Sequence, residues 1–508
     1  MGEMFLRPGT PDDDNRDYLP EKIKGSDIVV NENGNNSQPY PPLLKECHGV
    51  IADELEDEWY VYVPESYDPT KKTPLVVSLH GGMMTGWGQA IYTSWTLAAD
   101  RDGFIVLFPN ANYQRFWQVQ WGTWEMDPEI RTPGSMEGEP PGVKACPENV
   151  EDNHDIKMIL GLIDLMKQTY NIDEGRIFMQ GMSMGNMMTG LFARNFGHLL
   201  AGAAGSGAAA FLSLVFTKDG KIINRGGPLA IWQSRPEKND IPPGRDIEKK
   251  VHKYNRLYWM RINGCDPIPQ ISIQGENNLA FYTGEKADMV YYDIKNRDHG
   301  QTFDDAVLVW DYLFSGVRRE SDGTIVRIQP ARERKGDAFA FAITTGSDKM
   351  WFHNSVQEMS GPTLLWNKMK YHGLDGGQKI RGQYHMMPLS ALAKVFDARL
   401  DYSEHHLVAR MRLSDGRAIQ FARGSIGCVI DNSLVQMYCE ALDRSGDLYV
   451  SAEWFAEYLC GMHVSECEDV VYVTDHASKL SANMADLIKD LLMGTIVPDH
   501  YEQMLEEK

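Results

Sequence analysis

The sequence lacks several features that would place it in a specialised class. No run of about 18 uncharged apolar residues occurs among its 508 residues, so no membrane-spanning helix is expected. The seven cysteines form no C-x-x-C pair, which argues against a zinc ribbon or a dithiol redox motif. The start, MGEMFLRPGTPDDDNRDYLP, has neither the basic region nor the apolar run of a secretory signal. This leaves a cytoplasmic protein or a mature or engineered start as open alternatives.

Basic residues are fewer than acidic ones. Lys and Arg number 50 against 71 Asp and Glu, so the formal net charge is −21. Such a chain repels phosphate backbones, and nucleic-acid binding is not expected. What is present is ordinary globular composition, with 43% apolar and 24% charged residues. Disorder, collagen and a small disulfide scaffold are therefore excluded as descriptions of the whole chain.

From about Glu46 the pattern alternates strands with helices. Two continuous apolar runs, 73–82 and 104–111, are typical of strands buried on both faces of a parallel sheet. The alternation predicts an α/β fold with a mainly parallel sheet over residues 46–320, preceded by a lead-in at 1–45. The expected strands are 58–67, 73–82, 104–111, 176–180, 228–234 and 289–295, and the expected helices are 90–101, 155–170 and 304–314.

A second region follows a charged stretch, broken by Gly and Pro, after about Val317. Here the segment from Pro388 is echoed 63 residues later by the segment from Ser451, and each unit is predicted to be a short helix followed by a strand. We expect a smaller α+β module over residues 338–476. The tail, 477–508, carries an amphipathic helix that is expected to dock on one of the domains.

The nucleophile is predicted from Gly181-Met182-Ser183-Met184-Gly185, which fits G-x-S-x-G. The motif follows a predicted strand and precedes a helix-compatible run, as a nucleophile elbow requires, and its small residues suit a tight turn. The alternative is a glycine-rich strand-to-helix turn with a structural serine. Upstream, His80-Gly81-Gly82 ends a buried strand. We expect the Gly82 N–H, with Met83 as a further candidate, and the Met184 N–H to form an oxyanion hole.

The general base is expected to follow the nucleophile in the chain. His299, in NRDHGQTF, comes just after the last predicted strand and just before the closing helix, so it is the candidate. His80 is expected to be a structural residue beneath the glycine loop. His252 lies in a charged helical stretch, HKYNRLYW, and is predicted to be a surface residue.

The orienting carboxylate is expected after the strand that follows the elbow unit. Asp240 is preferred because it stands just before a proline-rich turn, and Glu237 and Asp266 remain alternatives. Three tryptophans, Trp117, Trp121 and Trp124, fall in the loop after the 104–111 strand. Loops at this edge of an open sheet line ligand sites, so these rings are candidates for substrate stacking, with plain packing as the alternative for at least two of them.

Four blocks, YVYVPESYDPTKKTPLVVSLHGG, ADRDGFIVLFPNA, NIDEGRIFMQGMSMGNMM and RDHGQTF, together resemble the poly(3-hydroxybutyrate) depolymerase and feruloyl esterase group of α/β-hydrolases. The resemblance implies hydrolysis of aryl, hydroxycinnamoyl or short-chain acyl esters, small or carbohydrate-linked, with no metal or organic cofactor. It also implies secretion, in which case Cys146 and Cys265 are candidates for a disulfide; seven reduced cysteines in a cytoplasmic protein are the alternative. The string at the acid position departs from the family by about one residue. Asn186 and Met187 stand where many relatives have small residues.

The repeat region, about 339–475, is similar to the copper amine oxidase N-terminal-like domain, a name that does not imply copper. His405, His406 and His463 lack metal-ligand spacing, so no metal site is expected. Three other functions remain open for the chain: a polyester depolymerase, a serine peptidase of the prolyl-oligopeptidase type, and a surface-binding protein with an inert hydrolase unit.

Overall fold

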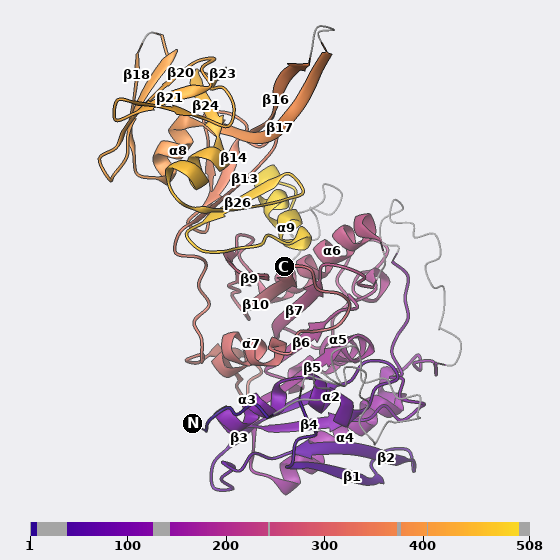
Figure 1. Cartoon of the computed structure of the whole chain (residues 1–508). Coiled ribbons are helices and arrows are strands. Elements are labelled where there is room, and N and C mark those ends of the chain that lie inside the picture. Colours follow the sequence, from indigo (N-terminus) through magenta and orange to yellow (C-terminus); the bar gives the residue numbers. More distant parts are fainter. Residues whose placement is uncertain are drawn as a thin grey trace.

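The computed structural model describes residues 2–7, 38–124, 143–241, 244–372, 377–403, 405–444 and 446–496. Figure 1 shows a large domain, which contains the first ten strands, and a smaller C-terminal module stacked on one end of it. Most of the expected lead-in and the end of the tail lie outside the described residues. Within the described part, no helix combines the length and apolarity needed to cross a bilayer.

The large domain is built on a ten-stranded mixed sheet whose strands run in the order β1-β2-β4-β3-β5-β6-β7-β10-β9-β8. The centre, from β4 to β10, is parallel, and both ends are antiparallel. The predicted α/β class with a mainly parallel sheet is thus confirmed. The strands are β1 (Leu44–Val50), β2 (Glu56–Tyr62), β3 (Thr73–Leu79), β4 (Ile105–Pro109), β5 (Ile172–Met182), β6 (Gly202–Ser206), β7 (Ala230–Pro236), β8 (Gln270–Gln274), β9 (Asn277–Tyr282) and β10 (Met289–Ile294).

Helices cover both faces of this sheet, and each face has its own core. Along β4, Ile105 and Leu107 join the core under α4, α5 and α6, whereas Val106 and Phe108 join the core under α2, α3 and α7. Because both faces of the strand are buried, its residues form a continuous apolar run in the sequence. The helices are α2 (Gly86–Tyr92), α3 (Trp95–Asp102), α4 (His154–Thr169), α5 (Met184–Phe196), α6 (Arg245–Asn263) and α7 (Asp305–Tyr312). A small ribbon, β11 (Val317–Arg319) and β12 (Ile325–Arg327), follows α7.

The C-terminal module consists of three antiparallel sheets. Its two sequence repeats start side by side, because the end of β17 pairs with β24 through Met386↔Ser451 and Pro388↔Tyr449. After each of these strands come a short helix and a hairpin. The strands are β13 (Ala340–Thr344), β14 (Lys349–Phe352), β15 (Ser355–Glu358), β16 (Leu364–His372), β17 (Gly377–Pro388), β18 (Arg399–Ser403), β19 (Val408–Arg412), β20 (Ala418–Ala422), β21 (Gly427–Ile430), β22 (Ser433–Gln436), β23 (Leu442–Arg444), β24 (Asp447–Ser451), β25 (His463–Cys467) and β26 (Val470–Thr474), and the helices are α8 (Leu389–Val395) and a π-helix (Trp454–Leu459).

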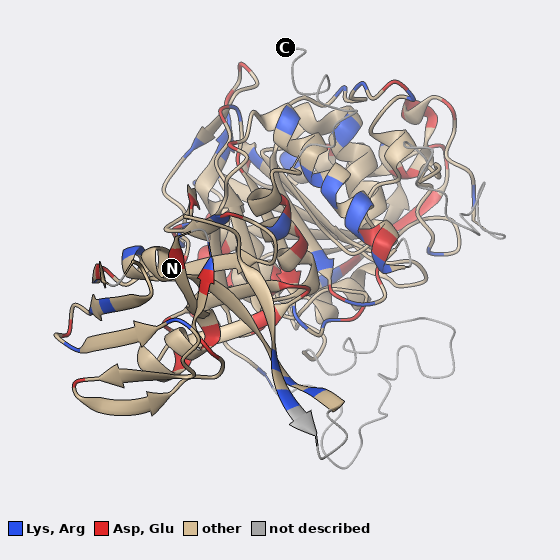
Figure 2. Cartoon of the chain, turned by 90° about the horizontal axis from the view of Figure 1, so that it is seen from above, with Lys and Arg blue, Asp and Glu red and all other residues tan. Residues whose placement is uncertain are grey.

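One hairpin of the module, β16–β17, projects away from the rest of the molecule (Figure 1). Lys and Arg mark both of its strands in Figure 2. Lys370 and Lys379 are direct cross-strand partners, as are the exposed Met369 and Ile380. The arm is therefore basic in a chain whose net charge is strongly negative.

The module and the large domain share buried contacts at the β8 edge. The Asp337 carboxylate, 7% exposed, accepts hydrogen bonds from Ser272 Oγ (2.8 Å), the Ile273 N–H (3.0 Å) and Tyr472 O–H (2.6 Å). Trp351 of the module belongs to the same apolar cluster as the large-domain helices α4, α5 and α6. The two parts therefore have one continuous core on this side of the sheet.

The tail helix α9 (Ala482–Met493) lies between the module and α6 (Figure 1). Its first amides are bound by carboxylates from two strand ends: the Ala482 N–H donates to Glu237 after β7 (3.0 Å), and the Asn483 N–H donates to Asp293 of β10 (3.2 Å). Negative groups at a helix N-terminus are favourable because they offset the helix dipole. The basic side chains of α6 pair with acids of α9 and the module, namely Arg245 and Lys249 with Glu468 and Asp486, and Lys253 with Asp490.

Removing the Asp337 carboxylate should destabilise the protein. Asp337→Ala leaves two side-chain donors and one backbone N–H without an acceptor inside the contact, and each unsatisfied buried group costs about 1–3 kcal/mol. We expect a lower urea midpoint by intrinsic fluorescence. Asp401→Ala, which removes an exposed ion pair with Arg399, is the control and should change stability by less than about 1 kcal/mol. Equal midpoints for the two variants would contradict the role of Asp337.

Candidate functional site

Ser183 occupies a strained turn between β5 and α5. Its backbone has φ 55° and ψ −120°, a conformation that a non-glycine residue adopts at a cost of about 1–3 kcal/mol. The flanking glycines are required by close packing: a Cβ on Gly181 would lie 2.1 Å from the Gly185 carbonyl oxygen, and one on Gly185 would lie 2.3 Å from that of Leu79. The turn thus holds the serine hydroxyl away from both the strand and the helix.

His299 lies beside this serine. Its Nε2 is 3.0 Å from Ser183 Oγ, and its Nδ1 is 3.5 Å from Asp240 Oδ1. With the proton on Nδ1, Nε2 accepts the hydrogen bond of the serine hydroxyl. The imidazole follows β10 and the carboxylate follows β7, so the parallel strands bring both to the carboxyl edge of the sheet.

The Asp240 carboxylate is buried, with 2% of the residue exposed. Its Oδ1 accepts hydrogen bonds from the N–H groups of Ala208 and Ile241, both at 2.8 Å. Burial alone would raise the pKa of Asp240, but the imidazoles of His252 and His299 lower it by more, so its pKa lies below the ordinary value. The carboxylate is therefore ionised at neutral pH.

The prediction that His252 is a surface residue is wrong. His252 is 1% exposed, and its Nε2 lies 3.3 Å from Asp240 Oδ2. The neighbouring Lys249 and Lys253 pair with acids of the module and α9, so this part of α6 lies at a packed interface and not at the surface. Burial lowers the pKa of His252, so the ring is neutral and can direct an N–H toward the carboxylate.

The structure does not bring the other two acid candidates to His299. Glu237 accepts hydrogen bonds from Lys295, the Asn296 N–H and the first amide of α9. Asp266 is exposed in the turn before β8, where its carboxylate accepts the Ile268 N–H at 2.9 Å. Of the three carboxylates, Asp240 alone lies within ion-pair distance of the imidazole.

Two of the three candidate oxyanion donors are available. Met184 is the first residue of α5, so its N–H has no acceptor within the helix. The Gly82 N–H has no acceptor among the described residues, and Met184 Sδ lies 2.9 Å from where a Cβ of Gly82 would be. The Met83 N–H, in contrast, already donates to the Arg115 carbonyl oxygen at 3.0 Å. The geometry therefore favours Gly82 and Met184.

His80 and Trp117 support the glycine loop from below. His80 is fully buried, its Nε2 accepts the Ala111 N–H at 3.0 Å, and its Nδ1 lies 2.6 Å from the Gly81 carbonyl oxygen. Burial lowers the pKa of His80 to about 4, so the ring stays neutral. Trp117 is also fully buried and donates its indole N–H to the His80 carbonyl oxygen at 2.8 Å.

The contacts of Trp117 and Trp124 are those of packing residues. Trp124 is 3% exposed and stacks on Phe211 with ring centroids 3.9 Å apart. Trp121 is partly buried, and its buried indole nitrogen has no hydrogen-bond partner among the described residues. Of the three rings, Trp121 is the one with free surface for a substrate.

A buried amide network fixes the loop that carries His299, and no sequence motif indicated it. Gln301 accepts a hydrogen bond from Gln180 Nε2 at 2.7 Å, and its backbone N–H donates to Tyr92 O–H at 2.8 Å. Gln180 in turn accepts hydrogen bonds from Ser78 (2.8 Å) and Trp95 (3.0 Å). Since Gln180 precedes Ser183 by three residues, one network positions both the strand before Ser183 and the loop that carries His299.

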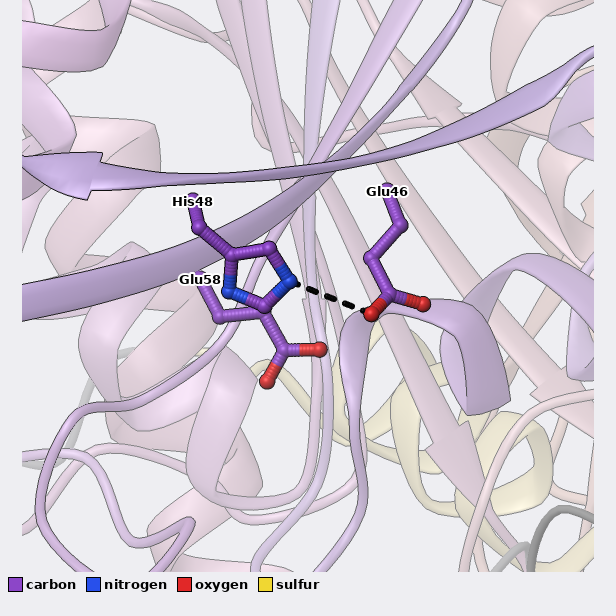
Figure 3. A group of neighbouring side chains, drawn as sticks. All are labelled: Glu46, His48 and Glu58. Carbon is purple, nitrogen blue, oxygen red and sulfur yellow. Dashed lines mark hydrogen bonds and ion pairs between the residues drawn. The ribbon is translucent and has the colours of Figure 1, made fainter.

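Groups with metal-binding side chains lie away from this site. Glu46, His48 and Glu58 face one another across β1 and β2, with His48 Nε2 3.1 Å from Glu46 Oε1 (Figure 3). Glu58 also accepts the hydrogen bond of Tyr60 O–H. A second group, His385, Glu453 and Glu466, lies in the module. The seven cysteines are all free, so Cys146 and Cys265 are not paired here.

The strand order, the sharp turn after β5 and the residue-bearing loops after β7 and β10 are those of the α/β-hydrolase fold. No protein-family model matches the chain. Among solved structures, an acetyl xylan esterase from Aspergillus awamori aligns with a TM-score of 0.38 and 16% identity, over 53% of this chain and 98% of that one. A thermostable esterase aligns with a TM-score of 0.30 and 19% identity, over 49% and 55%.

The sequence relatives include acetylxylan esterases, a feruloyl esterase and a dipeptidyl-peptidase 5 of Aspergillus fumigatus, to which the chain is 27% identical over 120 residues. The chain is 28% identical over 130 residues to the bifunctional acetylxylan esterase/xylanase XynS20E of Neocallimastix patriciarum and 30% identical over 154 residues to feruloyl esterase B of Neurospora crassa. It is 26% identical over 187 residues to acetylxylan esterase A of Emericella nidulans. These matches cover 26, 30 and 36% of this chain and 15, 44 and 53% of the relatives, so the chain spans about half of their length or less.

Replacing His80 should flatten the pH dependence of stability. Its pKa is lowered from 6.5 to about 4 by burial, so the unfolded chain binds a proton below pH 6.5 that the native state rejects down to pH 4. The contribution of His80 to the free energy of unfolding is therefore fully present above pH 6.5. It is lost as the pH falls toward 4, and the total loss is about 3 kcal/mol at most.

Between pH 6.5 and 4, His80→Gln should lose about 3 kcal/mol less of its free energy of unfolding than the wild type does. Urea unfolding at each pH measures this difference. The exposed His198, replaced by Gln, is the matched control and should keep the wild-type slope. A wild-type slope in His80→Gln would show that His80 is not held neutral.

Proposed function

We propose that this protein is a serine carboxylic ester hydrolase that works through Ser183, His299 and Asp240. The observation that carries the proposal is the chain of contacts from Ser183 Oγ to His299 Nε2 (3.0 Å) and from His299 Nδ1 to Asp240 Oδ1 (3.5 Å), on the strained turn after β5. The esterase relatives support the same class of reaction. No organic cofactor or metal enters this mechanism.

In the proposed mechanism, His299 Nε2 takes the hydroxyl proton as Ser183 Oγ attacks the ester carbonyl. The ionised Asp240 holds the imidazole in the required tautomer and stabilises its charged form. The N–H groups of Gly82 and Met184 stabilise the oxyanion, and one such donor contributes about 3–4 kcal/mol. The alcohol leaves with the proton from His299, and water then hydrolyses the acyl-enzyme with the same histidine as base.

The proposed substrates are aryl, hydroxycinnamoyl or short-chain acyl esters, small or carbohydrate-linked. The names of the relatives, acetylxylan and feruloyl esterases, support this range. Trp121 is the candidate ring for stacking on a phenolic acyl group or a sugar. Polyester cleavage is the second candidate, because four sequence blocks resemble polyhydroxybutyrate depolymerases as well. For the C-terminal module we keep the resemblance to the copper amine oxidase N-terminal-like domain as a proposal, with no metal.

Ser183→Ala should lower the rate of ester cleavage by roughly 10⁴-fold or more and leave the thermal unfolding midpoint unchanged or higher, since alanine keeps the fold and loses only the hydroxyl. The assay panel is p-nitrophenyl acetate, methyl ferulate, a hydroxybutyrate oligomer and a proline-containing peptide amide. Cleavage of the first two identifies the proposed class, whereas cleavage of the oligomer or peptide alone would redirect it. Retained ester turnover in the variant would disprove the role of Ser183.

The identity of the acid is tested by three conservative variants. Asp240→Asn should reduce kcat by about 10⁴-fold, because the amide favours the wrong imidazole tautomer. Glu237→Gln and Asp266→Asn are the matched controls, since neither side chain lies at His299. Both should retain kcat within a few-fold of the wild type. A large loss in Glu237→Gln, with Asp240→Asn active, would reverse the assignment.

A further inference from the structure

A cavity of about 60 Å³ lies behind the helix that follows Ser183, between α5, β6, β7 and α6. It exists because β6 has the sequence GAAGS, so glycine and alanine stand where a bulkier strand would fill the space. Polar side chains reach it from three elements: Thr189 and Arg194 from α5, Gln233 and Arg235 from β7, and Tyr258 from α6. The lining thus combines the small residues of β6, the large apolar side chains Phe211, Leu214 and Trp259, and these polar groups.

Two buried guanidinium groups line this cavity without a carboxylate partner. Arg194 is 6% exposed and Arg235 is 3% exposed. Arg194 reaches a side-chain oxygen of Gln120 at 3.5 Å, and Arg235 reaches the carbonyl oxygens of Ser234 (3.2 Å) and Gly207 (3.4 Å). Neither forms an ion pair within the described part of the chain. These contacts are few and long for groups that each carry five N–H donors.

Arg319, at 9% exposure, shows how a buried guanidinium is satisfied elsewhere, because it donates to four carbonyl oxygens. Arg256, at 6% exposure, lies 3.9 Å from a carboxylate oxygen of Asp490 and over the Tyr291 ring. Burying a charge without a partner costs several kcal/mol, so the two cations beside this cavity call for a counter-charge. Burial lowers the pKa of both Arg194 and Arg235, yet an arginine remains charged in proteins.

Further groups beside the cavity lack partners or hold the cations in place. Three buried atoms have no hydrogen-bond partner among the described residues: Arg235 Nε, Thr189 Oγ1 and Gln233 Oε1. The guanidinium of Arg194 packs closely against Gly190. A Cβ on Gly190 would lie only 3.1 Å from Nη1, so a larger residue would crowd the side chain. Burial lowers the pKa of Arg235 and the charge of Asp240 offsets only part of this, but no ion pair joins the two among the described residues. The Asp240 carboxylate already accepts hydrogen bonds from two amides and lies beside two imidazoles.

We propose that this cavity binds a small anion, either a carboxylate of about two or three carbons or an inorganic anion of similar size. The volume accommodates roughly four to six water-sized groups, and acetate has four non-hydrogen atoms. The anion supplies the charge that Arg194 and Arg235 lack, and the Thr189 hydroxyl donates to it. Guanidinium groups are suited to this because their N–H fork matches the two oxygens of a carboxylate. The inference does not depend on the proposed function.

The test is thermal unfolding of the wild type, first dialysed against a bulky zwitterionic buffer, with increasing acetate, chloride or phosphate. The unfolding midpoint should rise along a saturable curve with at least one of them, because an anion bound to the native state alone stabilises it. The three titrations distinguish an organic from an inorganic ligand. Acetamide, the neutral analogue of acetate, should give no saturable rise. Ser183→Ala should respond as the wild type does, which separates this result from any failure of the esterase proposal.

Arg194→Met tests the site itself. Without anion the variant should be as stable as the wild type or more stable, because an unpaired buried cation is removed. With saturating anion it should lose the rise in midpoint. Arg176→Met is the matched control: Arg176 is a largely buried arginine of β5 that stacks on Trp310 away from the cavity, and its response should remain. If Arg194→Met fails to fold, Thr189→Val replaces it and should weaken binding several-fold.

Two results would overturn the proposal. One is a wild type whose midpoint shows no saturable response to any of the three anions. The other is a folded Arg194→Met, or its substitute Thr189→Val, that keeps the full response of the wild type.

Discussion

The buried carboxylate of Asp240 is the constraint on which the rest of the site depends. An ionised group this far from water is stable only when neighbours replace its hydration. Here the Ala208 amide from the loop after β6, the adjacent Ile241 amide and His252 of α6 do so. Three separate segments must therefore be in place before His299 has its partner. The position of His299 therefore depends on the neighbouring strands β6, β7 and β10 and on the loops after them.

Helix α6 links this carboxylate to the far end of the chain. One face directs His252 and Asn255 inward, where Asn255 exchanges hydrogen bonds with the backbone of Ala210. Beside this face are the lysines and arginine that pair with α9 and the module. The C-terminal module thus packs on the helix that supports Asp240. At a second contact it covers the β8 edge, which would otherwise be an open sheet edge.

Much of the large domain follows from the sequence, because strands buried on both faces appear as apolar runs. This held for β3, β4, β7 and β10. Strand β6 was not predicted because its sequence, GAAGS, has no β-branched residue. The β8–β9 hairpin was not predicted because Gln, Asn and Ser interrupt its apolar residues. Small residues specify a strand only through the neighbours that pack over it.

The candidate site divides in the same way. Ser183, His299 and Asp240 were recognisable because each follows a strand in a fixed chain order. The prediction for His252 was wrong because the charged residues near it pair with acids of α9 and the module, which are distant in the sequence. The Gln180–Gln301 network carried no signal at all, since uncharged amides acquire meaning only when the fold pairs them. The sequence also does not show how far an aromatic side chain is buried. For this reason Trp117 and Trp124 could not be distinguished from Trp121 as candidates for substrate stacking.

The contact between α9 and the ends of β7 and β10 bears on the order in which the protein matures. Glu237 and Asp293 follow or end the strands that lead to Asp240 and His299, and they bind the first amides of a helix that starts at residue 482 of 508. On the ribosome, the large domain emerges well before that helix exists. Until that helix is released from the ribosome, both carboxylates lack those amide donors. The frame of the candidate site is therefore complete only after synthesis has passed residue 482, well beyond the last strand of the large domain.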